Sequence, residues 1–195
     1  MVTWRQLFLL CLLLVASRSS LRAASFAETR AYRTATNAFY DGMWLRAEHE
    51  LEQFGERFPR SEFLAEAVLL RAQAQYHQTN SASSIALLTA NLDRAGSLAD
   101  EYRFWIASGL YQQGNFSLAK FYIERAVDNL EKEHDPGVIL EHYGDILLAL
   151  KNEKKALEMW QKAWDSGKTD EELKIKIEKA NLNIENVKEN ESNNK

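Results

Sequence analysis

Small and apolar residues recur at fixed distances from four turn positions, Gly42, Thr79, Gly114 and Lys151. A small residue stands seven positions before and five positions after each turn, and a large apolar residue stands nine positions after it. The small residues are Ala35, Ala72, Ala107 and Gly144 before the turns, and Ala47, Ser84, Ala119 and Ala156 after them. The large residues are Leu51, Leu88, Ile123 and Trp160. Because successive units are offset by 37, 35 and 37 residues, the chain is expected to be an internal repeat.

This spacing predicts two helices in each unit. A small residue in each of two consecutive helices lets their backbones approach closely, and the bulky residue one turn later fills the space beside the crossing. Eight Gly and two Pro leave little material for the tight turns of a sandwich or barrel. We therefore expect an all-α fold with four antiparallel helix pairs, at residues 28–59, 62–93, 97–130 and 136–167. Asp135 is expected to cap the helix that Pro136 begins.

At these residues the chain resembles the tetratricopeptide repeat (TPR) family. The first unit reads Ala35-x3-Phe39-x2-Gly42-x-Trp44-x2-Ala47-x3-Leu51, and the third reads Ala107-x3-Tyr111-x2-Gly114-x-Phe116-x2-Ala119-x3-Ile123. The fourth unit, from Glu141 to Ala163, resembles the bacterial form. The likeness covers residues 28–167 and implies a right-handed solenoid that binds protein or peptide partners. The stretch from Phe58 to Ser61 is also similar to bacterial envelope proteins of this superfamily, which implies a periplasmic scaffold.

A final helix is expected at residues 169–188, after the fourth unit. Thr169 and Glu172 have the spacing of a capping box. One apolar stripe then follows at intervals of four, three, four and three residues, which predicts a helix that closes the exposed end of the array. The stripe consists of Leu173, Ile177, Ala180, Ile184 and Val187. Residues 189–195 are polar and rich in Asn and are expected to be a disordered tail.

Residues 1–25 have the layout of a secretory signal peptide, with Arg5, a ten-residue apolar run over residues 7–16 and a polar segment after it. Ten residues are too few to span a bilayer, although a signal retained as a membrane anchor remains an alternative. We expect cleavage near residues 25–27 and an exported protein, periplasmic or extracellular. The mature chain would have 21 basic and 28 acidic residues, a net charge of −7, and no Cys. It is not expected to bind nucleic acid or to insert stably into a membrane.

No motif for catalysis, metal binding or a cofactor is evident. The four histidines, at positions 49, 77, 134 and 142, include no pair spaced for a zinc site on one helix, and we expect solvated or locally bonded imidazoles. The glycines of Gly109–Gly114 have the spacing of a phosphate loop, but Asn115 and Phe116 replace its Lys and Ser or Thr. We therefore expect no enzyme and no cofactor. A hydrolase built from carboxylates distant in the sequence remains a rival reading.

The first helix of each pair should line the concave side of a curved stack, and its inner positions are the candidate partner-binding residues. This predicts an aromatic, mildly acidic groove suited to an extended or helical peptide. The same aromatic stripe also fits packing between adjacent pairs, and for Tyr76 and Tyr111 a mainly core role is expected. The candidates are Tyr32, Thr36, Tyr40, Gln73, Tyr76, Phe104, Ser108, Tyr111, Glu141 and Asp145, with His77 beside them.

The sequence thus predicts an exported, non-catalytic scaffold that holds a protein or peptide in its concave groove. The alternative is a glycan-binding or enzyme-accessory module of the cell envelope. Tyr102 and Trp105 lie one turn apart on a helix of which one side must be buried, so they are not both expected to be free for a ligand. The family's Lys, Arg and Asn residues that grip a C-terminal carboxylate are absent from the inner positions, so that function is not expected. The oligomeric state is left open.

Overall fold

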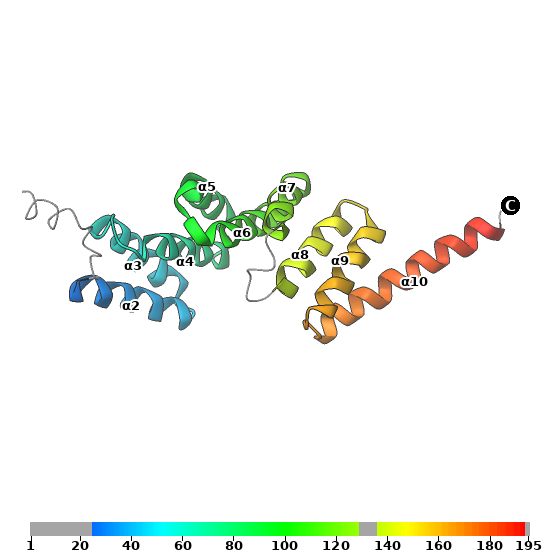
Figure 1. Ribbon diagram of the computed structural model, residues 1–195, viewed down its shortest axis with the longest axis horizontal. Coiled ribbons are helices and arrows are strands. Elements are labelled where there is room, and N and C mark those ends of the chain that lie inside the picture. Colours follow the sequence, from blue (N-terminus) through cyan, green and yellow to red (C-terminus); the bar gives the residue numbers. More distant parts are fainter. Residues whose placement is uncertain (1–24, 129–135, 194–195) are drawn as a thin grey trace, which may run out of the picture.

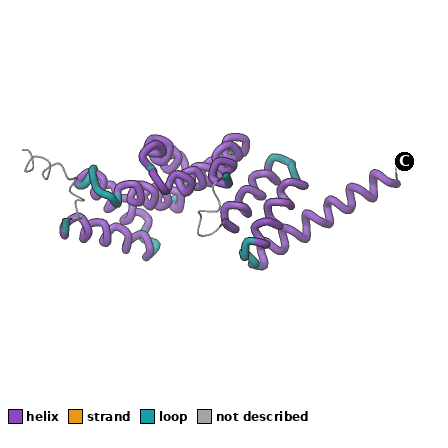
Figure 2. Tube along the Cα trace, in the orientation of Figure 1, coloured by secondary structure: helices purple, strands orange, loops and turns teal. Residues whose placement is uncertain are grey.

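A computed structural model describes residues 25–128 and 136–193 of the 195-residue chain. These residues form nine α-helices and two short 3-10 helices, and they contain no strand. The helices follow one another along an elongated molecule (Figures 1 and 2), with the C-terminal helix at one end. Residues 1–24 of the predicted signal peptide and the predicted cap Asp135 lie outside the described residues.

The helices pack in sequential pairs, and each helix contacts the next one along the chain. The first helices of neighbouring pairs also contact one another. The pairs are α2 (Phe26–Tyr40) with α3 (Trp44–Arg57), α4 (Leu64–His77) with α5 (Ser81–Asn91), α6 (Ala99–Gln112) with α7 (Phe116–Val127), and α8 (Pro136–Ala149) with α9 (Glu153–Asp165). The last helix, α10 (Glu171–Asn193), packs against α9. The predicted all-α array of helix pairs is confirmed.

The small residues of the repeat lie where helices pack most closely. Seven of the eight have no exposed surface, and the eighth, Gly144, is also buried. The large residues one turn later are buried as well, with exposed fractions of 2% for Leu51 and Trp160 and 0% for Leu88 and Ile123. Apart from Ser84 and Gly144, these positions belong to three hydrophobic clusters, one between the first pair and α4, one in the middle and one formed by the last pair and α10. The periodic small residues are therefore packing positions.

The four predicted turn residues share one backbone conformation. Their φ angles are +71° for Gly42, +63° for Thr79, +76° for Gly114 and +61° for Lys151, all in the left-handed region. The N–H of the following residue bonds to a carbonyl five residues back, as from Asn115 to Leu110 over 2.9 Å. This is the hydrogen-bond pattern of a Schellman motif, which satisfies the last carbonyls of a helix. Each first helix therefore ends in the same way, whether or not the turn residue is Gly.

Two predictions at the C-terminus need correction. The cap of α10 is Asp170, whose Oδ1 accepts from the N–H of Leu173 at 3.0 Å, rather than Thr169. The helix also continues to Asn193, through most of the segment expected to be disordered. Residues 189–193 contain no Gly or Pro, so a helix that has already formed can propagate through them.

The connection between the second and third helix pairs, residues 92–98, departs from regular α-helix. Two 3-10 helices, Leu92–Arg94 and Gly96–Leu98, connect α5 to α6.

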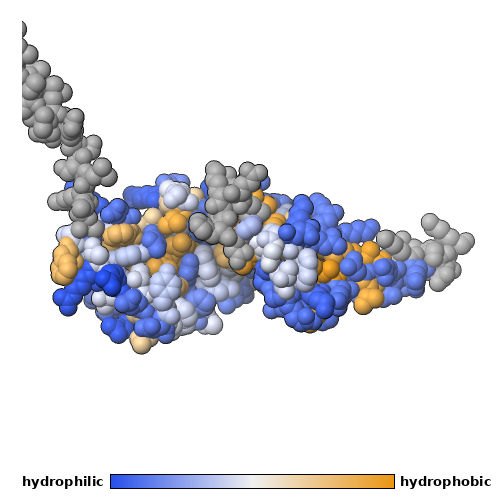
Figure 3. Space-filling view, turned by 60° about the horizontal axis from the view of Figure 1, so that its bottom comes forward, coloured by the Kyte–Doolittle hydropathy of each residue, from blue (hydrophilic) through white to orange (hydrophobic). Residues whose placement is uncertain are grey.

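Within the described residues, no helix is both long enough and apolar enough to cross a bilayer. The face in Figure 3 is mainly hydrophilic, and apolar residues show on it in separate places.

Candidate functional site

The candidate site is the surface formed by α2, α4, α6 and α8, which we call the first-helix face. The sequence placed ten candidate residues on these helices. The packing between neighbouring first helices brings several of them together, because rings from one pair contact rings from the next. The face therefore crosses the boundaries between the helix pairs.

A continuous set of ring contacts, the aromatic seam, runs across these boundaries. Trp44, the first residue of α3, stacks on His77 of α4 with centroids 4.3 Å apart, and Tyr76 meets Trp105 edge-on at 5.3 Å. His142 of α8 meets both Phe104 and Tyr111 of α6, at 5.5 and 5.3 Å. Edge-to-face contacts at these distances are favourable beyond the area that they bury. The seam consists of Trp44, Tyr76, His77, Phe104, Trp105, Tyr111 and His142.

The seam is partly a packing feature and partly a surface. Tyr76, Phe104, Trp105 and Tyr111 are all half-buried, so each packs between helix pairs and still presents part of its ring to solvent. Burial raises the pKa of both Tyr76 and Tyr111. Tyr102, one turn from Trp105, is only 1% exposed, so its ring is in the core.

The candidates on the first two helices differ in exposure. Tyr40 is 74% exposed at the end of α2. Tyr32 is half-buried and stacks on Phe63 at 4.6 Å, and burial together with the Glu66 carboxylate raises its pKa. Thr36 and Gln73 are half-buried too, and the Thr36 hydroxyl donates to a carbonyl of its own helix. All of these residues except Tyr40 therefore have packing roles.

Ser108 does not lie on the exposed part of the face. Only 4% of it is exposed, and its hydroxyl donates to the carbonyl of Phe104 at 2.9 Å. A serine inside a helix commonly satisfies its hydroxyl in this way when no other acceptor is near. Its predicted exposure is therefore corrected.

His142 also departs from expectation, because it is not a solvated imidazole. It lies between Phe104 and Tyr111, and its Nε2 atom is buried and has no hydrogen-bond partner. Burial, and then the nearby positive charge of Lys176, lowers the pKa of His142 to about 4. Its ring therefore behaves as a neutral aromatic member of the seam near neutral pH.

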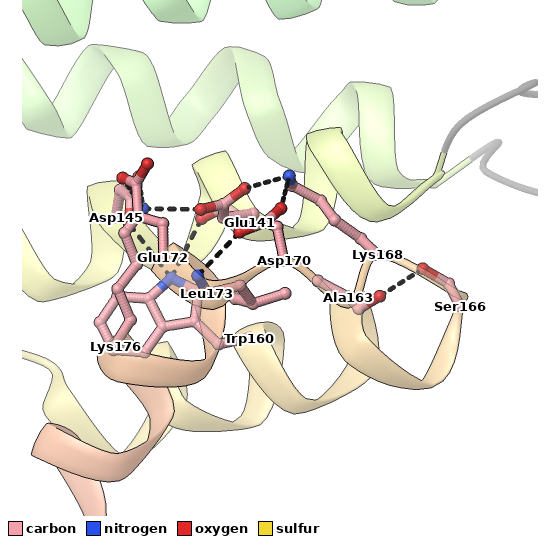
Figure 4. Close-up of polar contacts among 10 residues, drawn as sticks. All are labelled: Glu141, Asp145, Trp160, Ala163, Ser166, Lys168, Asp170, Glu172, Leu173 and Lys176. Atoms are coloured by element: carbon pink, nitrogen blue, oxygen red, sulfur yellow. Dashed lines mark hydrogen bonds and ion pairs between the residues drawn. The ribbon is translucent and has the colours of Figure 1, made fainter.

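Glu141 and Asp145, the two acidic candidates on α8, are engaged by lysines that the sequence analysis did not place at the site. The Nζ atom of Lys176 on α10 is 2.7 Å from Oε1 of Glu141 and 2.9 Å from Oδ2 of Asp145 (Figure 4). Lys168 pairs with Glu141 at 3.1 Å, and the indole N–H of Trp160 donates to Asp145 at 3.1 Å. We call these five residues the lysine–carboxylate cluster.

The electrostatics of this cluster are set by burial and pairing together. Burial raises the pKa of Asp145, although Lys176 and the Trp160 indole act in the opposite direction. Burial also disfavours the charge of Lys176, but hydrogen bonds to Glu141 and Asp145 outweigh that effect and raise its pKa. In the sequence, Lys176 stands next to Ile177 of the apolar stripe of α10. That position indicates a lysine close to the packed side of the helix, but it does not identify the carboxylates of α8 that the lysine binds.

The described residues contain no group of three or more His, Cys, Asp or Glu side chains placed to hold a metal ion. The aromatic seam and the lysine–carboxylate cluster instead supply flat apolar rings and fixed charges. Such features bind other molecules through contact area and charge pairing.

Comparisons with known proteins find likeness in structure and none in sequence. No protein-family model matches the chain, and no curated protein matches it significantly. The MamA RS-1 ArsTM double mutant is similar with a TM-score of 0.68 and 12% identity, over 83% of this chain and 86% of that one. A Podosopora anserina structure described as kinesin light chain nearly identical TPR-like repeats has a TM-score of 0.64 and 13% identity, over 84% and 90% of the two chains. The fold is therefore that of TPR-like repeat proteins.

Proposed function

We propose that this chain is an exported scaffold without chemistry of its own, which holds a protein or peptide partner on its first-helix face. The observation that carries the proposal is the half-buried aromatic seam. Rings that are packed on one side and open on the other offer a large contact area with little side-chain entropy to lose. The seam crosses from the first pair to the fourth, a span suited to a peptide several residues long.

The likeness to TPR-like structures is compatible with this role, since stacked helix pairs form extended surfaces that bind partners. The absence of catalysis is part of the proposal. Glu141 and Asp145, two partly enclosed carboxylates of the face, are bonded to lysines and an indole. Carboxylates held in this way are poorly suited to exchange protons with a substrate.

Export is proposed from the charged and apolar layout of residues 1–25. The described chain begins with Ser25, which caps α2 in a capping box: its hydroxyl accepts from the N–H of Glu28 at 3.1 Å, and its own N–H donates to that glutamate at 3.2 Å. Cleavage just before Ser25 would retain both bonds, whereas cleavage after Ser25, at the end of the predicted signal peptide, would remove them. Mass measurement of the N-terminus tests this proposal, because an intact Met1 contradicts cleavage.

Site-specific cross-linking tests where a partner binds. A photoreactive phenylalanine analogue at Tyr40 places the probe on the first-helix face, where 74% of that residue is exposed. The same analogue at Leu118 of α7, which is 41% exposed, is the control. In envelope extract, we expect one protein cross-linked from position 40 and competed by excess unlabelled chain, and none from position 118.

Two outcomes would contradict the proposed function. Equal cross-linking from both positions would remove the first-helix face as the binding surface. Sedimentation of the purified chain with peptidoglycan, without any protein cross-linked at position 40, would favour the glycan-binding alternative instead.

A further inference from the structure

We propose that copies of this chain associate end to end, with α2 of one copy docked in a hollow between α9 and α10 of the next. The two surfaces lie at opposite ends of the elongated molecule (Figure 1), so a single copy cannot bring them together. One of them is basic and the other acidic, and both have apolar side chains beside the charges. Neither includes a residue of the aromatic seam, so this contact is separate from the proposed binding of a partner.

Two positions on each internal first helix pack against the helix pair before it. They stand 12 and 9 residues before the turn position of each unit. In α4 they are Ala67 and Leu70, which lie in the hydrophobic cluster of the first pair. In α6 they are Tyr102 and Trp105, and both contact α4. In α8 the second of them, His142, contacts rings of α6. These two positions therefore mark the surface that receives a preceding helix pair.

On α2, the first helix of the described residues, the same two positions are Arg30 and Arg33. Both are exposed, and neither has an ion pair among the described residues. Phe26 lies on the same side of the helix, one turn before Arg30, and is 85% exposed. A polar surface suffices to keep the end of a repeat array soluble, and it requires neither charges of one sign nor an exposed phenylalanine. These three residues, which we call the α2 stripe, therefore suit an acidic surface that also has an apolar part.

A surface of that kind lies at the other end of the molecule, in the hollow between α9 and α10. Trp164 of α9 and Ile177 of α10, both half-buried, are its apolar part. Asp165 and Glu178 supply one carboxylate from each helix, and neither has an ion pair among the described residues. We call this surface the α9–α10 hollow. Its lining consists of Gln161, Trp164, Asp165, Lys174, Ile177 and Glu178.

The charges of the two surfaces are complementary. The α2 stripe has two arginines one turn apart, and the α9–α10 hollow has two carboxylates without a cation of their own. Lys174, which also lines the hollow, is offset by Glu171, with 3.7 Å between Nζ and Oε1. An arginine combines a charged head with an apolar stem, so Arg30 and Arg33 can reach the carboxylates while Phe26 lies against apolar side chains.

A second copy is the occupant that these observations favour, because the chain itself supplies both surfaces. Contacts of this kind already join helix pairs within the chain, where Arg71 of α4 pairs with Glu52 of α3. The boundary between copies would repeat that arrangement, with a first helix docked on the helices before it. Two different surfaces at opposite ends form a head-to-tail contact, which extends into an open chain of copies instead of closing as a twofold dimer.

Sedimentation velocity of the full chain over a series of concentrations tests the inference. We expect the mean mass to rise with concentration beyond that of a dimer, and added salt to reverse the rise. Two neutral variants each remove the charges of one surface. Arg30→Gln with Arg33→Gln changes the α2 stripe, and Asp165→Asn with Glu178→Gln changes the α9–α10 hollow. Each variant alone should self-associate about tenfold or more weakly than the parent chain.

Mixing the two variants separates a head-to-tail contact from other kinds of association. The mixture retains one intact surface of each kind, so it should form a 1:1 complex with the affinity of the parent chain and no longer assembly. A matched control removes two other exposed arginines that have no ion pair among the described residues, as Arg60→Gln with Arg94→Gln. This control should self-associate as the parent chain does.

Three results would overturn the inference. They are a parent chain that stays monomeric at every concentration, self-association that persists unchanged in either variant, and a mixture that associates no better than the variants do alone. Each of these results would leave the proposed binding of a partner on the first-helix face standing, because the aromatic seam is unchanged in all of the variants.

Discussion

The indole of Trp160 lies directly against the backbone of Gly144. A Cβ atom added at Gly144 would come within 2.4 Å of Cδ1 and Nε1 of that ring, closer than non-bonded atoms can approach. The indole N–H donates to the carbonyl oxygen of Glu141 at 3.2 Å, and the ring is 2% exposed, so it has no space into which to move. This contact joins α8 to α9.

We therefore predict that Gly144→Ala destabilises the protein. The added methyl group must displace Trp160 or separate the two helices, and overpacking of this kind costs about 1–3 kcal/mol. Urea unfolding followed by circular dichroism measures the loss. It should appear although alanine is intrinsically the better residue in a helix.

Gly55 provides the matched comparison. It lies inside α3 without a positive φ, and an added Cβ would approach the Leu64 side chain only to 3.6 Å, an ordinary contact. Gly55→Ala should stabilise the protein by about 0.5–1 kcal/mol, because it reduces the freedom of the unfolded chain. If Gly144→Ala and Gly55→Ala change the free energy of unfolding equally, the contact with Trp160 is not the cause of the loss at Gly144.

The repeat was readable from the sequence for the same physical reason. A close helix crossing restricts its residue to a small side chain at a fixed place in every pair, as at Ala107 and Gly144. The turns were readable because a left-handed residue must follow each first helix. Thr79 and Lys151 adopt that conformation without being glycine, so there the neighbouring packing overrides local preference.

The lysine–carboxylate cluster leads to a second prediction, for Lys176→Met. Methionine keeps most of the apolar stem but removes the charge that offsets Glu141 and Asp145, which are 14% and 23% exposed. We expect a loss of about 1–3 kcal/mol, between the values for exposed and buried pairs. Hydrogen exchange should show faster exchange along α10. Lys179→Met, at an exposed position of α10 without an ion pair among the described residues, should change neither quantity.

A third prediction concerns pH and His142. Its folded-state pKa, about 4, is below the ordinary value of 6.5, so between these values the unfolded chain binds more protons than the folded one. This contribution to stability is fully present above pH 6.5 and is lost as pH falls toward 4. The loss from this one residue is on the order of 2–3 kcal/mol at pH 4. His142→Phe, which keeps an aromatic ring in the seam, should lose less stability than the parent chain over this range.

Proton NMR of the His142 ring provides the direct measurement. Its Cε1–H signal should titrate with a midpoint near 4, because burial is the main cause of the lowered pKa. A midpoint near 6.5 would show that the ring is solvated and would remove the basis for the predicted difference.

Tyr102→Phe is the fourth test, because it removes only the hydroxyl that joins α6 to α4. Burial raises the pKa of Tyr102 to about 12, and its O–H donates to Ala65 at 2.7 Å. Loss of this bond removes a hydrogen bond between the two helices, which should cost about 1–2 kcal/mol in thermal or urea unfolding. Tyr122→Phe removes a half-buried hydroxyl without a hydrogen bond among the described residues and should be close to neutral.

The candidate site was less predictable than the fold. Helix periodicity placed Tyr76, Phe104 and Tyr111 on one face but gave no information on how deeply each ring would pack. Burial depends on the adjacent pair, which is why Ser108 proved to be 4% exposed. The pairing of Asp145 with Lys176 joins residues 31 positions apart through the docking of α10, and no local spacing encodes that contact.

The aromatic seam has a mechanical consequence. Rings that interlock across the junctions between pairs, such as Trp105 on Tyr76 and His142 on Phe104, resist twisting of one pair against the next. We therefore expect the array to be stiff along its length, with a constant spacing between successive exposed ring edges. The partner proposed above would then meet a preorganised surface, and its affinity would not be reduced by the entropy of ordering the helix pairs.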